Sequence, residues 1–595
     1  MRGAVTRVFV EPVGVSVEVA AGRTLLDALT SAAVAVPIDC HGRGTCGKCL
    51  VRLGAGEVTP PTEAELQKLT SQQLAGGWRL ACQTVPLSAS LSIEVREVTG
   101  RRRIPTASSL SRGRLRPAVR KEVVQVVPAT LEDARSDARR LGDELPGDAL
   151  SLPALRALPD VLRGGDWRAL VTRYGRRVVD VETQATAAEA YGAAVNIGTS
   201  KIIVYLFDLL DGRLIGQEAL ENPQMRFGED VITRITHALD GRLGELSRAA
   251  LDGINQALET LYSRHRIHAR HLYDMTVVGN TAMHHLALGI SPEGLSGAPF
   301  APAVDEPLQL RGADLTLAMN PEGGVHFLPP IAGFVGSDAL AVVAATRLEA
   351  QKLPSMAIDI GTNTEISLSV NGRVTSTSCA SGPAFEGYQI TNGMKAVEGA
   401  VERVVIDGAG MVRRISTIGG APPLGICGSG VIDVLAGLVR AGVVDRSGRM
   451  QPHPCVQHGR QGREYLLAQG PDGDIVFTQQ DVRALQLAKG AIATGWALLL
   501  ERSGLALEDL HTVFVAGAFG NYLDVHNSLR IGLLPPLPAA RISFVGNAAG
   551  VGAQMALLDV RARRRIAGLR ARIGFLELAT DKDFHEAFAA RLGFE

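Results

Sequence analysis

Four cysteines near the start of the chain have a spacing that could hold an iron–sulfur cluster. Three of them lie in one glycine-rich segment and the fourth follows 32 residues later, which gives the pattern C-x5-C-x2-C-x32-C. Cysteine thiolates hold 2Fe–2S clusters, and the plant-type pattern differs from this one by a single residue in the first gap. The predicted cluster ligands are Cys40, Cys46, Cys49 and Cys82.

The residues between these cysteines favour a cluster over other sites. Gly42, Gly44 and Gly47 permit the left-handed turns that a loop needs to aim its N–H groups at the sulfurs. A zinc site normally has two C-x2–4-C pairs, and only one is present. A P-loop needs a Ser or Thr where Cys49 stands, and a helix where Leu50–Leu53 reads as a strand. The pattern resembles the vertebrate-type and bacterial hydroxylase-type 2Fe–2S ferredoxins.

A second set of candidate residues lies in two similar segments. Residues 193–216 and 355–377 each read as an apolar strand, an Ile-Gly-Thr turn, a second strand and a hairpin turn, Asp211-Gly212 or Asn371-Gly372. Backbone N–H groups and hydroxyls in such turns bind phosphates. The matched turns indicate a duplicated domain with one phosphate loop in each half.

Further glycine turns follow in a fixed order. A strand ending at Gly517–Gly520 is placed to cover adenosine, and residues 333–339 and 545–553 read as helices that cross closely at a hinge. This order resembles the acetate and sugar kinase/heat-shock/actin (ASKHA) superfamily, whereas the Gly-x-Gly-x-x-Gly of a dinucleotide fold is missing. The predicted nucleotide-binding residues are Gly198, Thr199, Ser200, Gly361, Thr362, Asn363, Thr364, Gly517 and Gly520.

The two loops differ at one informative position. Asp359 stands two residues before Gly361 and is the predicted catalytic residue, placed to reach Mg²⁺. The first loop has Asn196 there, an amide that carries no charge and cannot act as a base. Because efficient phosphoryl transfer uses a carboxylate near the nucleophile, we expect slow ATP use.

Composition limits the class of protein and its location. The 595 residues carry 61 basic and 61 acidic side chains, so nucleic acid is not an expected partner. The start of the chain lacks the apolar core of a signal peptide, and no apolar run of about 18 residues predicts a membrane span. Seven cysteines do not form a disulfide framework, so we expect a cytoplasmic protein.

The expected fold is multidomain α/β. It consists of a β-grasp 2Fe–2S ferredoxin domain (1–97), a basic flexible linker (98–118), a small middle α/β domain (119–188) and a duplicated actin-like, ribonuclease H-like ATPase (189–595) with lobes at about 189–352 and 353–595. His284 and His285 are adjacent, so we expect one core and one surface histidine rather than a shared metal site. No functional role is predicted for Cys379 or Cys455, and Cys427 reads as a buried thiol.

The combination resembles the reductive activators of corrinoid-dependent enzymes, which join a 2Fe–2S domain to an ASKHA ATPase. The resemblance covers nearly the whole chain and includes several further segments: 221–224, 228–231, 278–285, 381–387, 425–430 and 486–492. It implies that an electron from the cluster returns Co(II) of a corrinoid protein or methyltransferase to Co(I) with the help of Mg²⁺-ATP. Our hypothesis for the coupling is that ATP closes the cleft between the Gly198 and Gly361 loops. An upstream reductase would recharge the cluster.

Two alternatives remain open at this point. One is a metabolite kinase of the same superfamily with a redox-sensing ferredoxin domain, against which Asn196 argues mildly. The other is an electron-transfer adaptor with a vestigial ATP fold. Homodimers are common in this architecture, although no coiled coil or other self-association signal supports one here.

Overall fold

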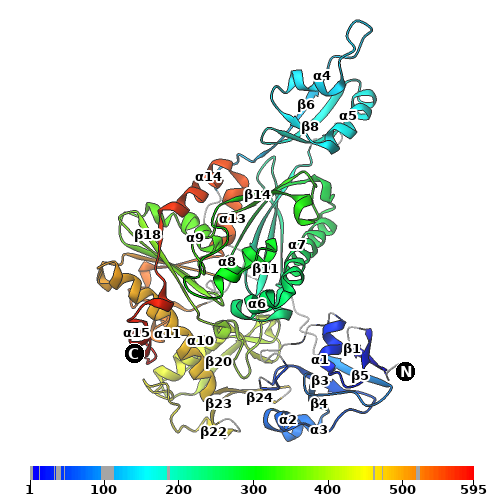
Figure 1. The fold of residues 1–595 in the computed structure, drawn as a ribbon. Coiled ribbons are helices and arrows are strands. Elements are labelled where there is room, and N and C mark those ends of the chain that lie inside the picture. The colour runs from blue at the N-terminus through cyan, green and yellow to red at the C-terminus, as the bar shows by residue number, and fades with distance from the viewer. Residues whose placement is uncertain are drawn as a thin grey trace. The chain divides into compact units, whose positions relative to one another are not determined.

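The computed structural model describes residues 5–11, 14–32, 34, 36, 42–45, 47–95, 113–183, 186, 188–459, 462–471, 473–517 and 523–594 (Figure 1). The predicted site residues Cys40, Cys46 and Gly520 lie outside this range. The chain forms two compact units. The first contains residues 1–103, 383–488 and 592–595, and the second contains residues 104–382 and 489–591. None of the described helices is both long and apolar enough to cross a membrane.

The N-terminal domain is a β-grasp sheet, as predicted (blue in Figure 1). The strands, in the order β2-β1-β5-β3-β4, are β1 (Val5–Glu11), β2 (Val15–Ala20), β3 (Leu50–Leu53), β4 (Trp78–Leu80) and β5 (Ser90–Val95). The helices are α1 (Leu25–Ser31), α2 (Glu63–Lys68) and α3 (Ser71–Ala75). Buried and exposed residues alternate along β1, so Val8 and Val10 enter the core while Phe9 faces outward.

The first unit also contains a small mixed sheet, a small antiparallel sheet and a buried helix. The strands are β19 (Ala400–Ile406), β20 (Val412–Thr417), β21 (Gly425–Ile426), β22 (Val456–Gly459), β23 (Gly462–Gly470) and β24 (Gly473–Thr478). Helix α10 (Gly428–Arg440) begins after Cys427, whose thiol is buried and donates to the carbonyl of Val401 at 3.3 Å. The burial, which raises the pKa of the Cys427 thiol, confirms the predicted buried thiol.

The small domain before the ATPase is a four-stranded sheet with two helices on one face. Its elements are β6 (Val119–Gln125), α4 (Asp137–Glu144), β7 (Ala149–Leu150), α5 (Leu152–Gly164), β8 (Arg168–Tyr174) and β9 (Arg177–Glu182). The strand order is β6-β8-β9-β7. Helix α4 begins at Asp137, where the Ser136 side chain caps the helix.

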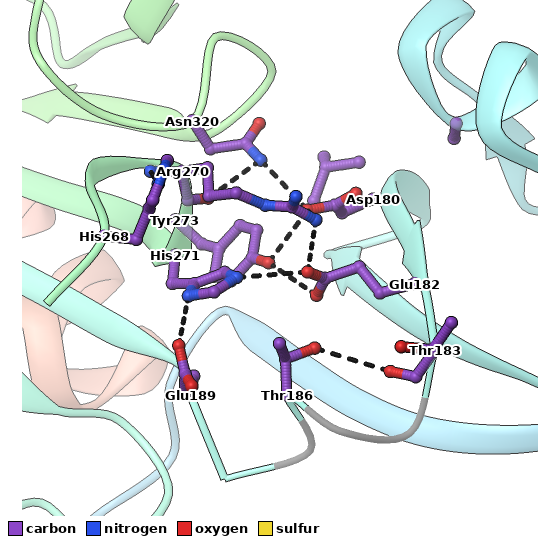
Figure 2. A network of polar contacts seen from close by, with 12 residues as sticks. Asp180, Glu182, Thr183, Thr186, Glu189, His268, Arg270, His271, Tyr273 and Asn320 are labelled. Atoms are coloured by element: carbon purple, nitrogen blue, oxygen red, sulfur yellow. Dashed lines mark hydrogen bonds and ion pairs between the residues drawn. The ribbon is translucent and has the colours of Figure 1, made fainter.

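A buried polar network fastens this small domain to the ATPase within the second unit. Lys121 of β6 donates to Glu182 of β9 at 2.9 Å, and both side chains are at most 3% exposed. Figure 2 shows Glu182 facing Arg270, His271 and Tyr273 of the ATPase. The first two lie just before strand β13 (Leu272–Gly279), and Tyr273 is the second residue of that strand. Burial alone would raise the pKa of Glu182, but the Lys121 and Arg270 cations hold it below the usual 4.5.

Lys121→Met is expected to weaken this attachment strongly. Removing one partner of a buried ion pair leaves an uncompensated charge and costs about 3–5 kcal/mol; we expect about 3 here because Arg270 still faces Glu182. Faster amide exchange in β6 and β9 would report the loss, and the double variant Lys121→Met/Glu182→Leu should recover part of it. Arg135→Met, which removes an exposed ion pair of the same domain, should change little. Equal exchange in both single variants would contradict the assignment.

The ATPase repeats one sheet arrangement twice, as the sequence predicts. In the first half β12-β11-β10-β13-β15 are neighbours, and in the second half β18-β17-β16-β25-β26, with matching antiparallel and parallel pairs. The strands are β10 (Tyr191–Ile197), β11 (Lys201–Asp208), β12 (Leu214–Glu221), β14 (Leu308–Arg311), β15 (Gly324–Phe327), β16 (Ser355–Asp359), β17 (Thr364–Val370), β18 (Arg373–Cys379), β25 (Thr512–Ala516), β26 (Ile542–Gly546) and β27 (Ile573–Phe575).

The helices of the ATPase pack on these sheets. They are α6 (Val231–His237), α7 (Leu243–His265), α8 (Thr281–Leu288), α9 (Ser337–Thr346), α12 (Val525–Arg530), α13 (Ala548–Leu558), α14 (Val560–Leu569) and α15 (Phe584–Ala590), with α11 (Gln479–Arg502) continuing from the first unit into the second. A Cβ on Gly552 of α13 would lie 2.4 Å from the Ala341 carbonyl of α9. The predicted close crossing of these two helices is therefore confirmed.

The expectation of one surface histidine on α8 is wrong. His284 and His285 are both buried, because residues near Ala303 fold back over the helix. The Ala303 N–H donates to Nε2 of His285 at 3.0 Å, while Nδ1 of the same ring lies 2.8 Å from the Thr281 carbonyl. Both ring nitrogens of His285 therefore have backbone partners, which is a structural role.

Candidate cluster-binding and nucleotide-binding sites

Two of the predicted cluster ligands lie side by side at the end of one strand pair. Cys49 directly precedes β3 and Cys82 follows β4, and the Ala81 N–H donates to the Cys49 carbonyl at 2.8 Å. Both thiols are buried. The hydrogen bond with Cys49 lowers the pKa of Cys82 to about 6, against the opposing effect of burial. A thiol ionised near neutral pH is in the form that ligates metal.

The loop beside these cysteines has the backbone that the glycines predict. Gly42, Gly44 and Gly47 have φ values of +85°, +75° and +72°, which favour glycine. A Cβ on Gly44 would lie 2.8 Å from the Gln83 side chain, and Gln83 itself donates to the Gly42 carbonyl at 2.9 Å. Together with the two adjacent thiols, this tight turn fits a 2Fe–2S cluster.

A buried carboxylate supports the second half of the cluster motif. Glu65 accepts hydrogen bonds from Arg79 at 2.8 and 2.9 Å, from the Leu80 N–H at 2.9 Å and from the Thr84 hydroxyl at 3.2 Å. These partners flank Cys82 on both sides and so fix the position of its backbone. Sequence reasoning missed Glu65, although Thr62-x-x-Glu65 is a capping-box signature that marks the start of α2.

The two predicted phosphate loops face one another in the second unit. Residues 198–200 connect β10 to β11, and residues 360–363 connect β16 to β17. The Ser200 and Thr362 hydroxyls lie 2.9 Å apart and are hydrogen-bonded, although 162 residues separate them in the chain. Both side chains are buried, at 8% and 7% exposure. The structure therefore brings the two loops together.

The first loop is held from behind by residues with no predicted role. Asn222 donates to the Gly198 carbonyl at 2.8 Å, and Arg234 of α6 donates to the Thr199 carbonyl at 2.7 Å. Arg234 is fully buried, which lowers its pKa to about 9. Segments 221–224 and 228–231 are among those that resemble a known family, but the sequence alone gives them no role. Their position behind the first loop indicates that they support its backbone. Arg234 itself had no signal in the sequence.

Three carboxylates gather beside the second loop. Asp359 ends β16 and pairs with Glu365 across the hairpin, while Asp338 comes from the first turn of α9. Burial and then the charge of Asp338 raise the pKa of Asp359 to about 7. Burial raises the pKa of Asp338 to about 6, and burial and both neighbours raise the pKa of Glu365 well above 4.5. No three His, Cys, Asp or Glu side chains among the described residues are arranged to hold a metal ion by themselves. Mg²⁺ is commonly bound by one or two carboxylates together with water and nucleotide phosphates, and Asp359 could serve in such a site.

Gly517 and Asn196 complete the same region. Gly517 follows β25 with φ +112°, and a Cβ there would lie 2.3 Å from the Ile360 carbonyl and 3.2 Å from an Asp359 oxygen. The Asn196 amide oxygen is buried and has no hydrogen-bond partner among the described residues. The predicted residues 198–200, 361–364 and 517 therefore lie close together in the second unit. The Asn196 oxygen, a buried acceptor without a described partner, is consistent with a polar ligand bound there.

Models of known families match consecutive parts of the chain. The C-terminal domain of RACo, the ASKHA domain, matches residues 354–595, and the RACo middle region matches residues 191–351. The RACo linker region matches residues 108–188, and a 2Fe-2S iron-sulfur cluster binding domain matches residues 8–87.

Individual relatives agree with these matches. The corrinoid activation enzyme RamQ of Eubacterium limosum is 33% identical over 580 residues, which cover 94% of each chain. A Co(II) methylated amine-specific corrinoid protein reductase of Methanosarcina barkeri is 28% identical over 288 residues, 45% of this chain and 51% of that protein. The solved structure of a reductive activator for corrinoid, iron-sulfur protein is 33% identical with a TM-score of 0.76, covering 99% of this chain and 98% of that one.

These matches run through the cluster domain, the small domain and both halves of the ATPase in the same order. The chain therefore belongs to the RACo family, the reductive activators of corrinoid-dependent enzymes.

Proposed function

We propose that the protein is an ATP-dependent activator that returns a corrinoid protein or corrinoid-dependent methyltransferase from Co(II) to Co(I) by adding one electron. The proposal rests on one observation. The same chain contains a cysteine loop that fits a 2Fe–2S cluster and two facing, hydroxyl-bearing loops that fit a nucleotide. The alignment over 94% of the chain with a corrinoid activation enzyme supports the same activity.

The energetics explain why nucleotide is needed. The bound 2Fe–2S cluster supplies a one-electron donor, with a potential of about −400 mV for plant-type ferredoxins. Reduction of Co(II) in a corrinoid demands a lower potential, and each 59 mV costs about a factor of ten for a one-electron step. Nucleotide binding or hydrolysis can assist only if it changes the protein around the corrinoid. An ASKHA cleft with two facing loops is a hinge of this kind.

Individual residues have distinct proposed roles. Cys40, Cys46, Cys49 and Cys82 would hold the cluster, and residues 198–200, 361–364, 517 and 520 would hold ATP. Asp359 would bind the accompanying Mg²⁺ and is the proposed catalytic residue. The first loop carries Asn196 in place of a second such aspartate, which favours slow, switch-like hydrolysis over metabolite phosphorylation.

The electron donor and the oligomeric state of the protein are two further parts of this proposal. Each cycle oxidises the protein by one electron, so an upstream reductase must recharge it. A homodimer, which is common in this architecture, is tested by light scattering of the purified protein, and a monomer would exclude it.

The activity is tested by mixing the purified protein, a chemical reductant, Mg²⁺-ATP and Co(II) corrinoid proteins of methylamine, O-demethylase or methionine-forming systems. We expect Co(I) absorbance to rise with ATP and to stay flat without it. A rise without ATP would favour a plain electron-transfer adaptor. No rise with any corrinoid protein, together with ATP-dependent phosphorylation of a metabolite, would favour a kinase.

A further inference from the structure

A buried cation without a counter-charge lies directly behind the first phosphate loop. Arg234 of α6 is fully buried, and its guanidinium donates to the Gly228 carbonyl at 2.8 Å and to the Thr199 carbonyl at 2.7 Å. Its third nitrogen lies 3.2 Å from the Met283 sulfur. All three partners are neutral. The described part of the chain places no carboxylate within ion-pair distance of Arg234, and the whole arrangement belongs to the second unit.

The nearest acidic side chains do not neutralise this charge. Burial lowers the pKa of Arg234 to about 9, and Asp230 and Glu229 oppose that effect only in part. The Asp230 carboxylate is engaged by its own helix, where it accepts from the Thr233 N–H at 2.8 Å and from the Thr233 hydroxyl at 2.7 Å. A charge buried without a partner lowers the stability of a fold, so buried cations are normally paired. Arg234 is an exception to this rule.

The charge of Arg234 lies close to the backbone that is predicted to contact phosphates. Thr199 and Ser200 belong to the loop between β10 and β11, and Arg234 is one hydrogen bond away from that backbone. The Ser200 hydroxyl in turn lies 2.9 Å from the Thr362 hydroxyl of the second loop. Charges interact more strongly in a protein interior than in water, and salt screens them less. An anion held by the first loop is therefore attracted by Arg234.

Charge is distributed unequally around the two phosphate loops. Three carboxylates lie beside the second loop, whereas Arg234 lies behind the first. Lys201, which directly follows the first loop, stands opposite Glu221 in the pairing of β11 with β12, so an acidic residue accompanies that cation. This arrangement is complementary to Mg²⁺-ATP if the phosphates lie against the first loop and the Mg²⁺ lies toward the second.

We propose that Arg234 is the positioning residue for the triphosphate, and that the phosphates of ATP supply the counter-charge it lacks, across the Thr199 backbone that it also holds. The proposal rests on the proposed function and deepens it, because it names the group that makes the first loop select a polyphosphate. Binding of the anion removes the cost of the unpaired charge, so that cost adds to the affinity. Affinity should therefore increase from adenosine to ADP to ATP.

The first test measures nucleotide affinity of the full-length protein by calorimetric titration, without any corrinoid protein. Arg234→Gln retains N–H donors but loses the charge, and should weaken ATP binding on the order of 30-fold, ADP binding less and adenosine binding hardly at all. Arg234→Lys retains the charge and should recover most of the ATP affinity. Equal ATP affinities of the Gln and Lys variants, or equal losses for ATP and adenosine, would show that Arg234 only holds the loop and would overturn the proposal.

A second test leaves Arg234 in place and supplies a counter-charge from the protein. Met283→Glu puts a carboxylate where the sulfur now contacts the guanidinium, and Met283→Gln is its uncharged match. Without nucleotide, Met283→Glu should melt at a higher temperature than Met283→Gln, and it should bind ATP more weakly. Equal ATP affinities in this pair would also overturn the proposal.

Arg226→Gln is the control for loss of an arginine from the same segment. Arg226 is exposed, and its guanidinium carbon lies 4.8 Å from the centre of the Phe227 ring. Because water and salt screen an exposed charge, this variant should bind ATP like the wild type. A wild type that binds ATP but reduces no corrinoid protein would refute the proposed function alone. A wild type that performs the reduction, together with unchanged ATP affinity in Arg234→Gln, would refute only the role of Arg234.

Discussion

Asp359→Asn is expected to abolish ATP-dependent reduction of Co(II) while leaving the absorption spectrum of the cluster unchanged. The substitution removes the carboxylate that ends β16 in the middle of the acidic group formed with Asp338 and Glu365. Loss of one positioned acid–base or electrostatic group typically costs about 10²–10⁴-fold in rate. ATP turnover and Co(I) formation should fall together by this factor.

The same substitution should not destabilise the protein. The pKa of Asp359 is raised from 3.8 to about 7, so its ionised form costs folding free energy that accumulates as the pH rises between these values. Asparagine carries no such cost, so the melting temperature of the nucleotide-free variant at neutral pH should be no lower than that of the wild type. A lower melting temperature with unchanged ATP turnover would contradict this account of Asp359.

Asp211→Asn is a matched control for this experiment. Asp211 lies in the exposed turn at the far end of the first ATPase hairpin, where asparagine is also a good turn residue. It changes the same chemical group in the same unit without touching the acidic group. Activity of this variant should equal that of the wild type.

Cys82→Ser is expected to have the reverse effect of Asp359→Asn, because it should damage the cluster site and spare the nucleotide site. It should lose the cluster and with it all Co(II) reduction, yet retain nucleotide affinity. The reason is that Cys82 is a buried thiol whose pKa is lowered to about 6, and serine has no thiolate to offer. The nucleotide loops belong to the other unit of the chain, so they should not depend on this ligand. Iron content, visible absorption and nucleotide titration measure the three quantities.

Cys455→Ser is the corresponding control for a cysteine substitution. Cys455 is half-buried beside Met411, in a part of the first unit that contains none of the predicted ligands. This variant should retain its cluster and activity. A Cys82→Ser protein with full iron content would contradict the ligand assignment.

Local signals in the sequence predicted the strands and turns well. The β-grasp strands follow from alternation of apolar residues, as in Val8 and Val10, and the ATPase hairpins from their turns. Asn371 and Gly372 both adopt positive φ, as a two-residue hairpin turn requires. Even Glu365 could have been predicted, because a hairpin centred on Thr362 places it opposite Asp359.

Contacts between distant residues could not be predicted in this way. Asp338 joins Asp359 only because α9 begins beside the second loop, and Arg234 reaches Thr199 only after α6 folds under the first. Lys48 donates to the Gly387 carbonyl, which is 339 residues away in the sequence. Neither residue type nor spacing encodes such pairs, because their geometry arises from the packing of whole domains.

The acidic group also explains how the two halves of the ATPase differ. Asp359 and Glu365 in the second hairpin correspond to Asn196 and Ile202 in the first, which carry no charge. Carboxyl groups are therefore concentrated beside the second loop, whose backbone carbonyls at Gly361 and Thr362 accept from the Ser381 hydroxyl.

The central claim is that ATP enables this protein to place one electron on a Co(II) corrinoid. The most direct measurement is a single turnover in which fully reduced protein, freed of external reductant, is mixed with a Co(II) corrinoid protein and Co(I) absorbance is followed. We predict up to one Co(I) per cluster with Mg²⁺-ATP and almost none without it. Equal Co(I) formation with and without ATP would contradict the account.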